Sequence, residues 1–130
     1  MGWTKMRQTV PAGTPYADAY GYSRAVRVAN QIHVSGTTAQ PPDLDGSDAY
    51  QQAKAALAII EAALKEVGSG LGSVVRTVVY VTDIADGELI AKAHQEAFGQ
   101  VYPASTLVEI SRLTDPRMKV EIEVYAVEAN

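Results

Sequence analysis

The chain lacks cysteine entirely and contains only two histidines among its 130 residues. Without cysteine it can form no disulfide, no thiolate metal site and no cysteine nucleophile, and a cytoplasmic location is expected. The two histidines, His33 and His94, belong to no metal-binding pattern such as HExxH. The sequence therefore predicts neither a bound metal nor a cofactor.

Long apolar runs and an excess of basic residues are also missing. No run approaches the roughly 18 apolar residues needed to cross a bilayer, and the first residues lack the apolar core of a secretory signal. The formal net charge is −4, whereas a surface that binds many phosphates is normally basic. We therefore expect neither a membrane nor a nucleic acid as a partner.

What the chain does contain fits a single domain spanning residues 1–130. The length is typical of one domain, and no internal repeat or long linker divides the sequence. Residues 1–15, which include the segment Pro11-Ala12-Gly13-Thr14-Pro15, predict an irregular N-terminal arm. Strand-forming residues at 21–28 and 32–35, joined by a tight connection, predict a hairpin.

Two helices and an interior strand are predicted downstream. After a loop, Ser47 or Asp48 can cap a helix whose apolar residues recur at helical spacing up to about Val67. A β-branched segment at residues 74–82 predicts an interior strand, and residues 87–99 predict a second amphipathic helix. With two strands at the C-terminal end, the order is ββαβαββ. This order predicts an α+β fold in which both helices pack on one face of a mixed sheet.

The last predicted strand alternates strictly between apolar and polar residues. Its apolar face contains Met118, Val120, Ile122, Val124 and Ala126. Glu121 and Glu123 share the other face, and same-face neighbours on a strand lie about 6.5–7 Å apart. At that distance two carboxylates raise each other's pKa if the face is covered, whereas water screens the effect on an open face. The pair indicates either a solvated sheet face or a carboxylate wall lining a cleft.

Two helices can cover only one face of such a sheet. The opposite face combines the two glutamates with Tyr125, Val127 and apolar groups of the interior strand. A mixed face of this kind predicts self-association, and closed cyclic symmetry is the usual outcome for soluble homo-oligomers. A ligand cleft between subunits would follow from the same mixture.

The order of elements and several motifs resemble those of the reactive-intermediate deaminase superfamily, also called the Rid, YjgF-like or endoribonuclease L-PSP superfamily. The resemblance runs from about Gly21 to Val127. It rests on Tyr22, on Ser35-Gly36 and on residues 75–83, 103–109 and 120–123. It implies a chorismate-mutase-like fold and a homotrimer with a central barrel and three clefts between subunits.

The same resemblance implies roles for particular residues. In active deaminases of the superfamily, an arginine after a Pro-Ala pair grips the substrate carboxylate, and a glutamate on the last strand orients the water that hydrolyses an imine. The glutamate matches Glu121 and the cleft tyrosine matches Tyr22. Ser105, followed by Thr106, stands where the arginine would be. The chain therefore resembles a subgroup that lacks the carboxylate-binding arginine.

A hydroxyl cannot reproduce the bidentate, charge-assisted pair of a guanidinium with a carboxylate. Losing such a buried contact typically costs about 2–5 kcal/mol of binding free energy, so we expect a changed choice of substrate. Arg24 shares a strand face with Tyr22 and could supply the missing cation, or could be a surface or intersubunit salt-bridge residue. His94 could be a packed histidine or a proton-transfer group in the cleft.

Two functions remain open. The first is a deaminase-like hydrolase in which Glu121 orients water against an imine, an enamine or a related electrophilic metabolite. The second is a non-catalytic trimer that binds a small metabolite in the same clefts. In both cases the predicted substrate-binding residues are Tyr22, Arg24, Gly36, Ser105, Thr106 and Leu107. Gly36 is included because a residue without a Cβ permits close approach of a ligand or an unusual turn conformation.

Overall fold

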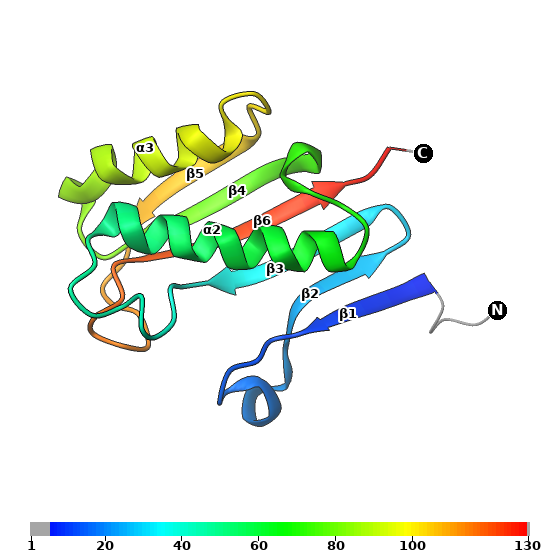
Figure 1. Ribbon diagram of the computed structural model, residues 1–130, viewed down its shortest axis with the longest axis horizontal. Coiled ribbons are helices and arrows are strands. Elements are labelled where there is room, and N and C mark those ends of the chain that lie inside the picture. Colours follow the sequence, from blue (N-terminus) through cyan, green and yellow to red (C-terminus); the bar gives the residue numbers. More distant parts are fainter. Residues whose placement is uncertain (1–5, 130) are drawn as a thin grey trace.

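The computed structural model describes residues 6–129 and contains one six-stranded sheet with two main helices on one face (Figure 1). The strands are β1 (Arg7–Pro11), β2 (Ser23–Val28), β3 (Gln31–Thr37), β4 (Val74–Val81), β5 (Ala104–Glu109) and β6 (Val120–Val127). The helices are α2 (Ala49–Glu66) and α3 (Gly87–Phe98), with short helical segments η1 (Ala17–Gly21), η2 (Leu71–Ser73) and η3 (Ile84–Asp86). The strand order is β1-β2-β3-β6-β4-β5, in which β4 and β5 are parallel and the other neighbours antiparallel. The predicted α+β class is confirmed.

Strand β1 corrects the expectation of an irregular arm. Residues 7–11 pair antiparallel with β2, and Val10 is the buried side chain of this strand. The register shifts between Val10 and Pro11, where proline has no backbone N–H to continue the ladder. With one buried apolar residue, the segment has too little periodicity to be recognised as a strand from sequence. Residues 1–5 of the expected arm lie outside the described residues.

Helix α2 begins where the capping pattern predicts. The Asp48 side chain accepts a hydrogen bond from Gln51 N at 2.8 Å, and the Gln51 side chain accepts one from Asp48 N at 2.9 Å. This capping box satisfies two backbone donors at the helix start. The helix therefore begins at Ala49, with its apolar stripe facing the sheet.

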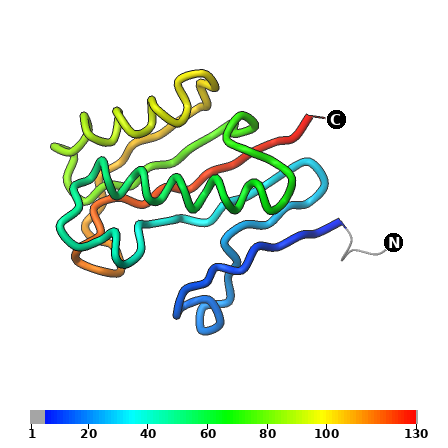
Figure 2. Tube along the Cα trace, viewed as in Figure 1, coloured from blue at the N-terminus to red at the C-terminus, as the bar shows by residue number. Residues whose placement is uncertain are grey.

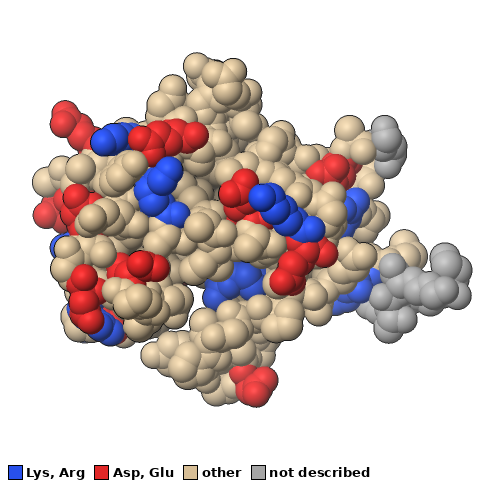
Figure 3. Space-filling view, viewed as in Figure 1, with Lys and Arg blue, Asp and Glu red and all other residues tan. Residues whose placement is uncertain are grey.

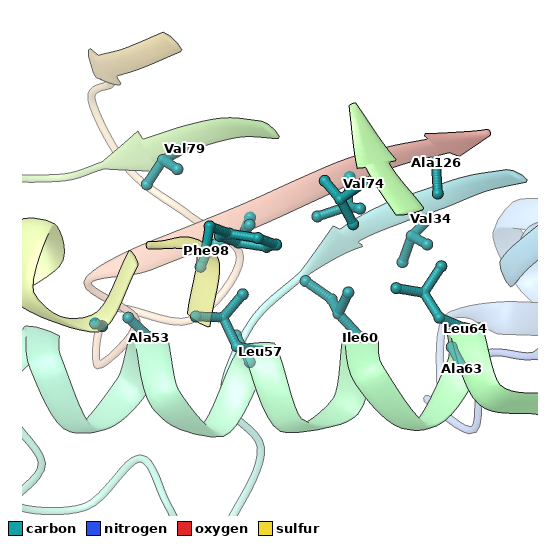
Figure 4. Packing of buried hydrophobic residues seen from close by; sticks show 14 of the residues in the cluster. Val34, Ala53, Leu57, Ile60, Ala63, Leu64, Val74, Val79, Phe98 and Ala126 are labelled. Carbon is teal, nitrogen blue, oxygen red and sulfur yellow. The ribbon is translucent and has the colours of Figure 1, made fainter. Parts of the chain in front are cut away.

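The core lies between the sheet and the two helices. Figure 4 shows facing side chains of this layer: Leu57, Ile60 and Leu64 of α2, Phe98 of α3, and Val34, Val74 and Val79 of the strands. Each fully buried side chain of this size stabilises the fold by about 1.5–3 kcal/mol. Gln52 is also fully buried. Its side-chain amide is satisfied there, since it donates to Arg117 O at 2.9 Å and accepts from Lys119 N at 2.8 Å. These two bonds tie α2 to the segment that leads into β6.

Strand β6 alternates as the sequence predicts. Its buried residues are Val120, Ile122, Val124 and Ala126, and its half-buried residues are Glu121, Glu123 and Tyr125. Helix α2 packs mainly on β6 and β3, so the β1–β2 end of the sheet extends beyond the helices (Figure 2). On the side of the molecule that carries the helices, acidic and basic side chains are interspersed (Figure 3). The sheet face away from the helices carries the polar residues of β6.

Candidate functional site

Two pockets on opposite sides of the sheet divide the predicted site residues between them. The Glu121 pocket, about 750 Å³, lies on the sheet face away from the helices, and Tyr22, Arg24, Gly36 and Glu121 are among its lining residues. The Ser105 pocket, about 330 Å³, lies between α3 and β5. Its lining includes Ser105, Leu107 and His94. The structure therefore brings together only part of the predicted set within one chain.

A bulge in β3 places Gly36 against Glu121. Val34 pairs with Val124 and Thr37 with Ile122, so β3 has one more residue than β6 between these pairs. A Cβ at Gly36 would lie 2.8 Å from Glu121 Cδ and 2.9 Å from Oε1. Real Cβ atoms do not approach so closely, which means that any other residue here would displace the carboxylate. Gly36 is therefore required for the position of Glu121.

Glu121 is half-buried, and its surroundings change its affinity for a proton. Burial raises the pKa of its carboxyl group, the charge of Glu123 raises it further, and Arg24 opposes both effects. Among residues 6–129, no side chain donates a hydrogen bond to Glu121. Its carboxyl oxygens thus remain available to a water molecule or a ligand.

Glu123, in contrast, accepts hydrogen bonds from two tyrosines that sequence analysis did not include among the site residues. Tyr80 donates to Glu123 Oε1 at 2.7 Å, and Tyr125 donates to Oε2. Its hydrogen bond to Glu123 raises the pKa of Tyr80 to about 12. The separate hydrogen bond from Tyr125 to Glu123 raises the pKa of Tyr125 as well. The strict alternation of β6 placed Tyr125 beside Glu123, whereas Tyr80 could be found only from the pairing of β4 with β6.

Arg24 lies in the Glu121 pocket and is only 6% exposed, so of the alternatives for this residue an exposed surface position is wrong. Its Nη1 donates to Gly36 O at 3.1 Å and to Thr37 Oγ1 at 3.0 Å, and its Nη2 donates to Ala12 O at 3.5 Å. Its buried Nε has no partner among the described residues, and no carboxylate of the described chain forms an ion pair with it. Arg24 thus holds the bulge at Gly36 and brings a positive charge close to Glu121.

Aromatic residues of the η1 segment form another wall of the same pocket. Tyr22 shares a 2.6 Å hydrogen bond with Thr14 Oγ1, and its ring lies 5.7 Å from the Arg24 guanidinium carbon. Tyr20 packs edge-on against Tyr22 with ring centroids 6.1 Å apart. Tyr16 and Tyr20 also line the pocket. Sequence analysis missed these two residues, because the region was expected to be irregular or the start of a strand.

On the other side of the sheet, Ser105 ends a chain of hydrogen bonds. Thr77, its paired residue in β4, is fully buried and donates to Ser105 Oγ at 2.6 Å. His94 Nε2 lies 2.9 Å from Thr77 Oγ1, and the His94 ring packs on Phe98 with centroids 4.8 Å apart. Burial lowers the pKa of His94. His94 is therefore both a packed histidine and a lining residue of the Ser105 pocket.

Strand geometry explains why Ser105 and Glu121 are separated within one chain. Ser105 pairs with buried Thr77 and points toward α3, whereas Glu121 pairs with Tyr80 on the opposite face. Thr106, the next residue of β5, accepts a hydrogen bond from exposed Arg76 at 3.0 Å and lines neither pocket. Alternation fixes which residues of one strand share a face, but the face itself depends on pairing with other strands.

Two further properties concern residues 6–129. No group of three or more histidine, cysteine, aspartate or glutamate side chains in this range is arranged to hold a metal ion. No helix in the same range has both the length and the apolar character required to cross a bilayer.

The fold and the Glu121 pocket together define a small α+β protein with a binding pocket on the open face of its sheet. Comparison with known proteins gives the family. The family model described as Endoribonuclease L-PSP matches residues 14–128. The chain belongs to this family, which confirms the superfamily that the sequence motifs resemble.

Individual relatives support the same assignment. The crystal structure of Rv2704 from Mycobacterium tuberculosis, described as a member of the highly conserved YjgF/YER057c/UK114 family, has 40% sequence identity and a TM-score of 0.87, covering 94% of this chain and 99% of that chain. An uncharacterized protein of Streptomyces coelicolor is 35% identical over 119 residues, covering 90% of this chain and 89% of that protein. The 2-iminobutanoate/2-iminopropanoate deaminase of Escherichia coli is 28% identical over 131 residues, covering 98% of each.

Proposed function

We propose that the protein is a deaminase-like hydrolase in which Glu121 orients water against the C=N carbon of an imine, or against a related electrophilic carbon. The observation that carries the proposal is the position of Glu121. Its half-buried carboxyl group lies against Gly36 in a pocket of about 750 Å³, and no described side chain donates a hydrogen bond to it. A raised pKa makes such a carboxylate a stronger base than an ordinary glutamate.

The proposed reaction begins with a water molecule hydrogen-bonded to the Glu121 carboxylate. The water oxygen bonds to the C=N carbon while one water proton passes to Glu121. The C=N π electrons move to the nitrogen, which takes this proton back from Glu121 to give a carbinolamine. Glu121 then accepts the hydroxyl proton and passes it to the nitrogen as the C–N bond breaks, which releases a carbonyl compound and ammonia. Tyr22 and Arg24 form the wall beside Glu121 and would contact the bound substrate.

We propose that the complete site forms between two copies of a homotrimer. Ser105 and Leu107 of one copy would face Glu121 of another, since the sheet separates these residues within a single chain. Strand β5, with all of its side chains exposed in the single chain, provides an edge for such a contact. Each pocket would then supply one side of a shared cleft.

Ser105 favours a substrate different from that of the Escherichia coli relative, whose name specifies 2-iminobutanoate and 2-iminopropanoate. Both compounds carry a carboxylate, and Ser105 offers a hydroxyl where the resemblance places an arginine. The same observation supports a second candidate function, a trimer that binds a small metabolite in the cleft without turnover.

Ammonia release from 2-iminopropanoate, generated in the assay, and from its uncharged amide analogue tests the proposal. Turnover should exceed the buffer rate, and Glu121→Gln should reduce it by a factor on the order of 10²–10⁴, because the base is lost. Glu61→Gln, on the exposed side of α2, is the control and should retain activity. Absence of turnover in the wild-type protein would favour the non-catalytic binder, whereas full activity of Glu121→Gln would contradict the proposed role of Glu121.

A further inference from the structure

The hydrogen-bond chain in the Ser105 pocket has no part in the reaction proposed above. It runs from His94 through Thr77 to Ser105, with atom separations of 2.9 and 2.6 Å. Thr77 is completely buried, and a buried hydroxyl is unfavourable unless it is hydrogen-bonded. The buried Thr77 hydroxyl therefore holds the middle of this hydrogen-bond chain in place, and Ser105 at its end lines the pocket.

The direction of this chain determines what Ser105 offers to a ligand. A hydroxyl has one hydrogen to donate. Thr77 donates its hydrogen to Ser105 and therefore accepts one from His94 Nε2. Burial lowers the pKa of His94, which favours the neutral ring. Because Thr77 donates to Ser105, we assign the hydrogen of the neutral ring to Nε2. Ser105 therefore keeps its own hydrogen for an acceptor in the pocket.

The rest of the pocket lining carries no lysine, arginine, aspartate or glutamate side chain. Apart from His94, Gln95, Tyr102 and Ser105, its side chains are apolar or absent. A carboxylate entering this lining would lose hydration and find no cation in it, which is unfavourable. Arg24 of the Glu121 pocket is a poor substitute, because both of its Nη atoms already donate to Gly36 O, Thr37 Oγ1 and Ala12 O. A carbonyl oxygen of an uncharged group needs only the single donor that Ser105 supplies.

Tyr102 provides a separate indication that this pocket receives a ligand. It lines the pocket, its side chain is 82% exposed, and its backbone has a φ of 56°. A left-handed backbone costs a non-glycine residue about 1–2 kcal/mol. Strain of this kind is concentrated at functional sites, where an otherwise unfavourable residue is retained. Glycine would be less strained than tyrosine at position 102. The exposed aromatic ring that occupies it is therefore a candidate for contact with a ligand.

We propose that the Ser105 pocket selects an uncharged group bearing a carbonyl oxygen, and that Thr77 and His94 are positioning residues that hold Ser105 as its donor. The inference rests on the proposed function in taking this pocket as one side of the substrate cleft. It adds to that function the substrate class: a neutral amide or ketone where the resemblance implies a carboxylate.

Pyruvate and pyruvamide share one skeleton and differ in charge, so their binding tests the inference. In NMR titrations the wild-type protein should bind pyruvamide more tightly than pyruvate. Thr77→Val should weaken pyruvamide binding by about 2- to 12-fold, the equivalent of one hydrogen bond. Thr77→Ser, which keeps the hydroxyl, should restore binding. Nitrogen-15 spectra should report a neutral His94 with hydrogen on Nε2, and Thr77→Val should change that signal.

Two further variants keep the test decisive if Thr77→Val fails to fold. Ser105→Arg should reverse the preference in favour of pyruvate, because it introduces a guanidinium into the pocket. Tyr102→Gly should weaken pyruvamide binding without loss of stability, because glycine adopts the left-handed backbone without strain.

Several results would overturn the inference. These are equal or tighter wild-type binding of pyruvate, no binding of either compound, and unchanged pyruvamide affinity in folded Thr77→Val. The titrations need no turnover, so they are independent of the ammonia assay. A protein that prefers pyruvamide but releases no ammonia would contradict the proposed reaction alone. One that releases ammonia without this preference would contradict the inference alone.

Discussion

Glu121 and Glu123 lie on the same face of β6, but their surroundings give them different properties. Two tyrosines donate hydrogen bonds to Glu123, whereas no side chain of the described residues donates to Glu121. Burial and the charge of Glu123 raise the pKa of Glu121. One carboxylate is therefore fixed as an acceptor, and the other remains available to act on water.

Replacing Glu123 by glutamine should lower the pKa of Glu121, because the neighbouring negative charge is removed. Activity that needs the Glu121 carboxylate should then persist to lower pH than in the wild-type protein. Carbon-13 NMR titration of the Glu121 carboxyl group measures this pKa directly. Tyr80→Phe is the matched control, since it removes one hydrogen bond to Glu123 and keeps the charge. An unchanged or higher pKa of Glu121 in Glu123→Gln would contradict the account.

The same substitution has a defined effect on stability. The pKa of Glu121 is raised in the folded chain, so the folded state holds this proton more tightly than the unfolded state does. The resulting stabilisation is fully present below the unfolded pKa and is lost as the pH rises through the folded pKa. Glu123→Gln should reduce that loss, which urea unfolding at a series of pH values would measure.

At the scale of elements, the bulge in β3 determines how the pocket is built. The extra residue between Val34 and Thr37 brings the Gly36 backbone against Glu121, and Arg24 donates a hydrogen bond to the Gly36 carbonyl oxygen. The sequence indicated a special backbone role for Gly36, but its contact with Glu121 follows only from the pairing of β3 with β6.

Gly36→Ala should displace the Glu121 carboxyl group, because the new Cβ would lie within 3 Å of it. The contacted atoms are the far end of a flexible side chain, which can move at little cost in stability. We therefore expect a fall in turnover with at most a small change in the free energy of unfolding. Gly72→Ala is the control, since nothing lies within 4 Å of a Cβ at that position. Urea unfolding and the ammonia assay measure the two effects, and wild-type activity in Gly36→Ala would refute the role of the bulge.

The elements differ in how well the sequence predicts them, and the reasons are physical. The alternation of β6 and the capped start of α2 are local patterns, so the strand faces were predicted correctly and Asp48 was one of the two predicted caps. Strand β1 has one buried residue and is held by its pairing with β2, which no local pattern reveals. The position of Ser105 on the helix side of the sheet likewise depends on its pairing with Thr77. Long-range pairing therefore accounts for what the sequence left undetermined.

At the scale of the whole molecule, the predicted site residues are divided between two pockets. Tyr22, Arg24, Gly36 and Glu121 line one pocket, and Ser105 and Leu107 line the other across the sheet. The resemblance assigns these residues to a single site. Residues from the two pockets can form a single site only if two copies of the chain meet, with β5 of one near the open sheet face of the other. A contact between copies, which the proposed homotrimer would provide, is thus a requirement of the proposed site.

The most direct test of this requirement is cross-linking between residues 105 and 121. The chain has no cysteine, so Ser105→Cys and Glu121→Cys each introduce a single thiol. The two variants, one isotopically labelled, would be mixed and treated with a short thiol-specific cross-linker. Glu61→Cys, on α2, replaces Ser105→Cys in the control. The account predicts dimers that join residue 105 of one variant to residue 121 of the other. Failure of that pair to cross-link more than the control pair would contradict a site shared between copies.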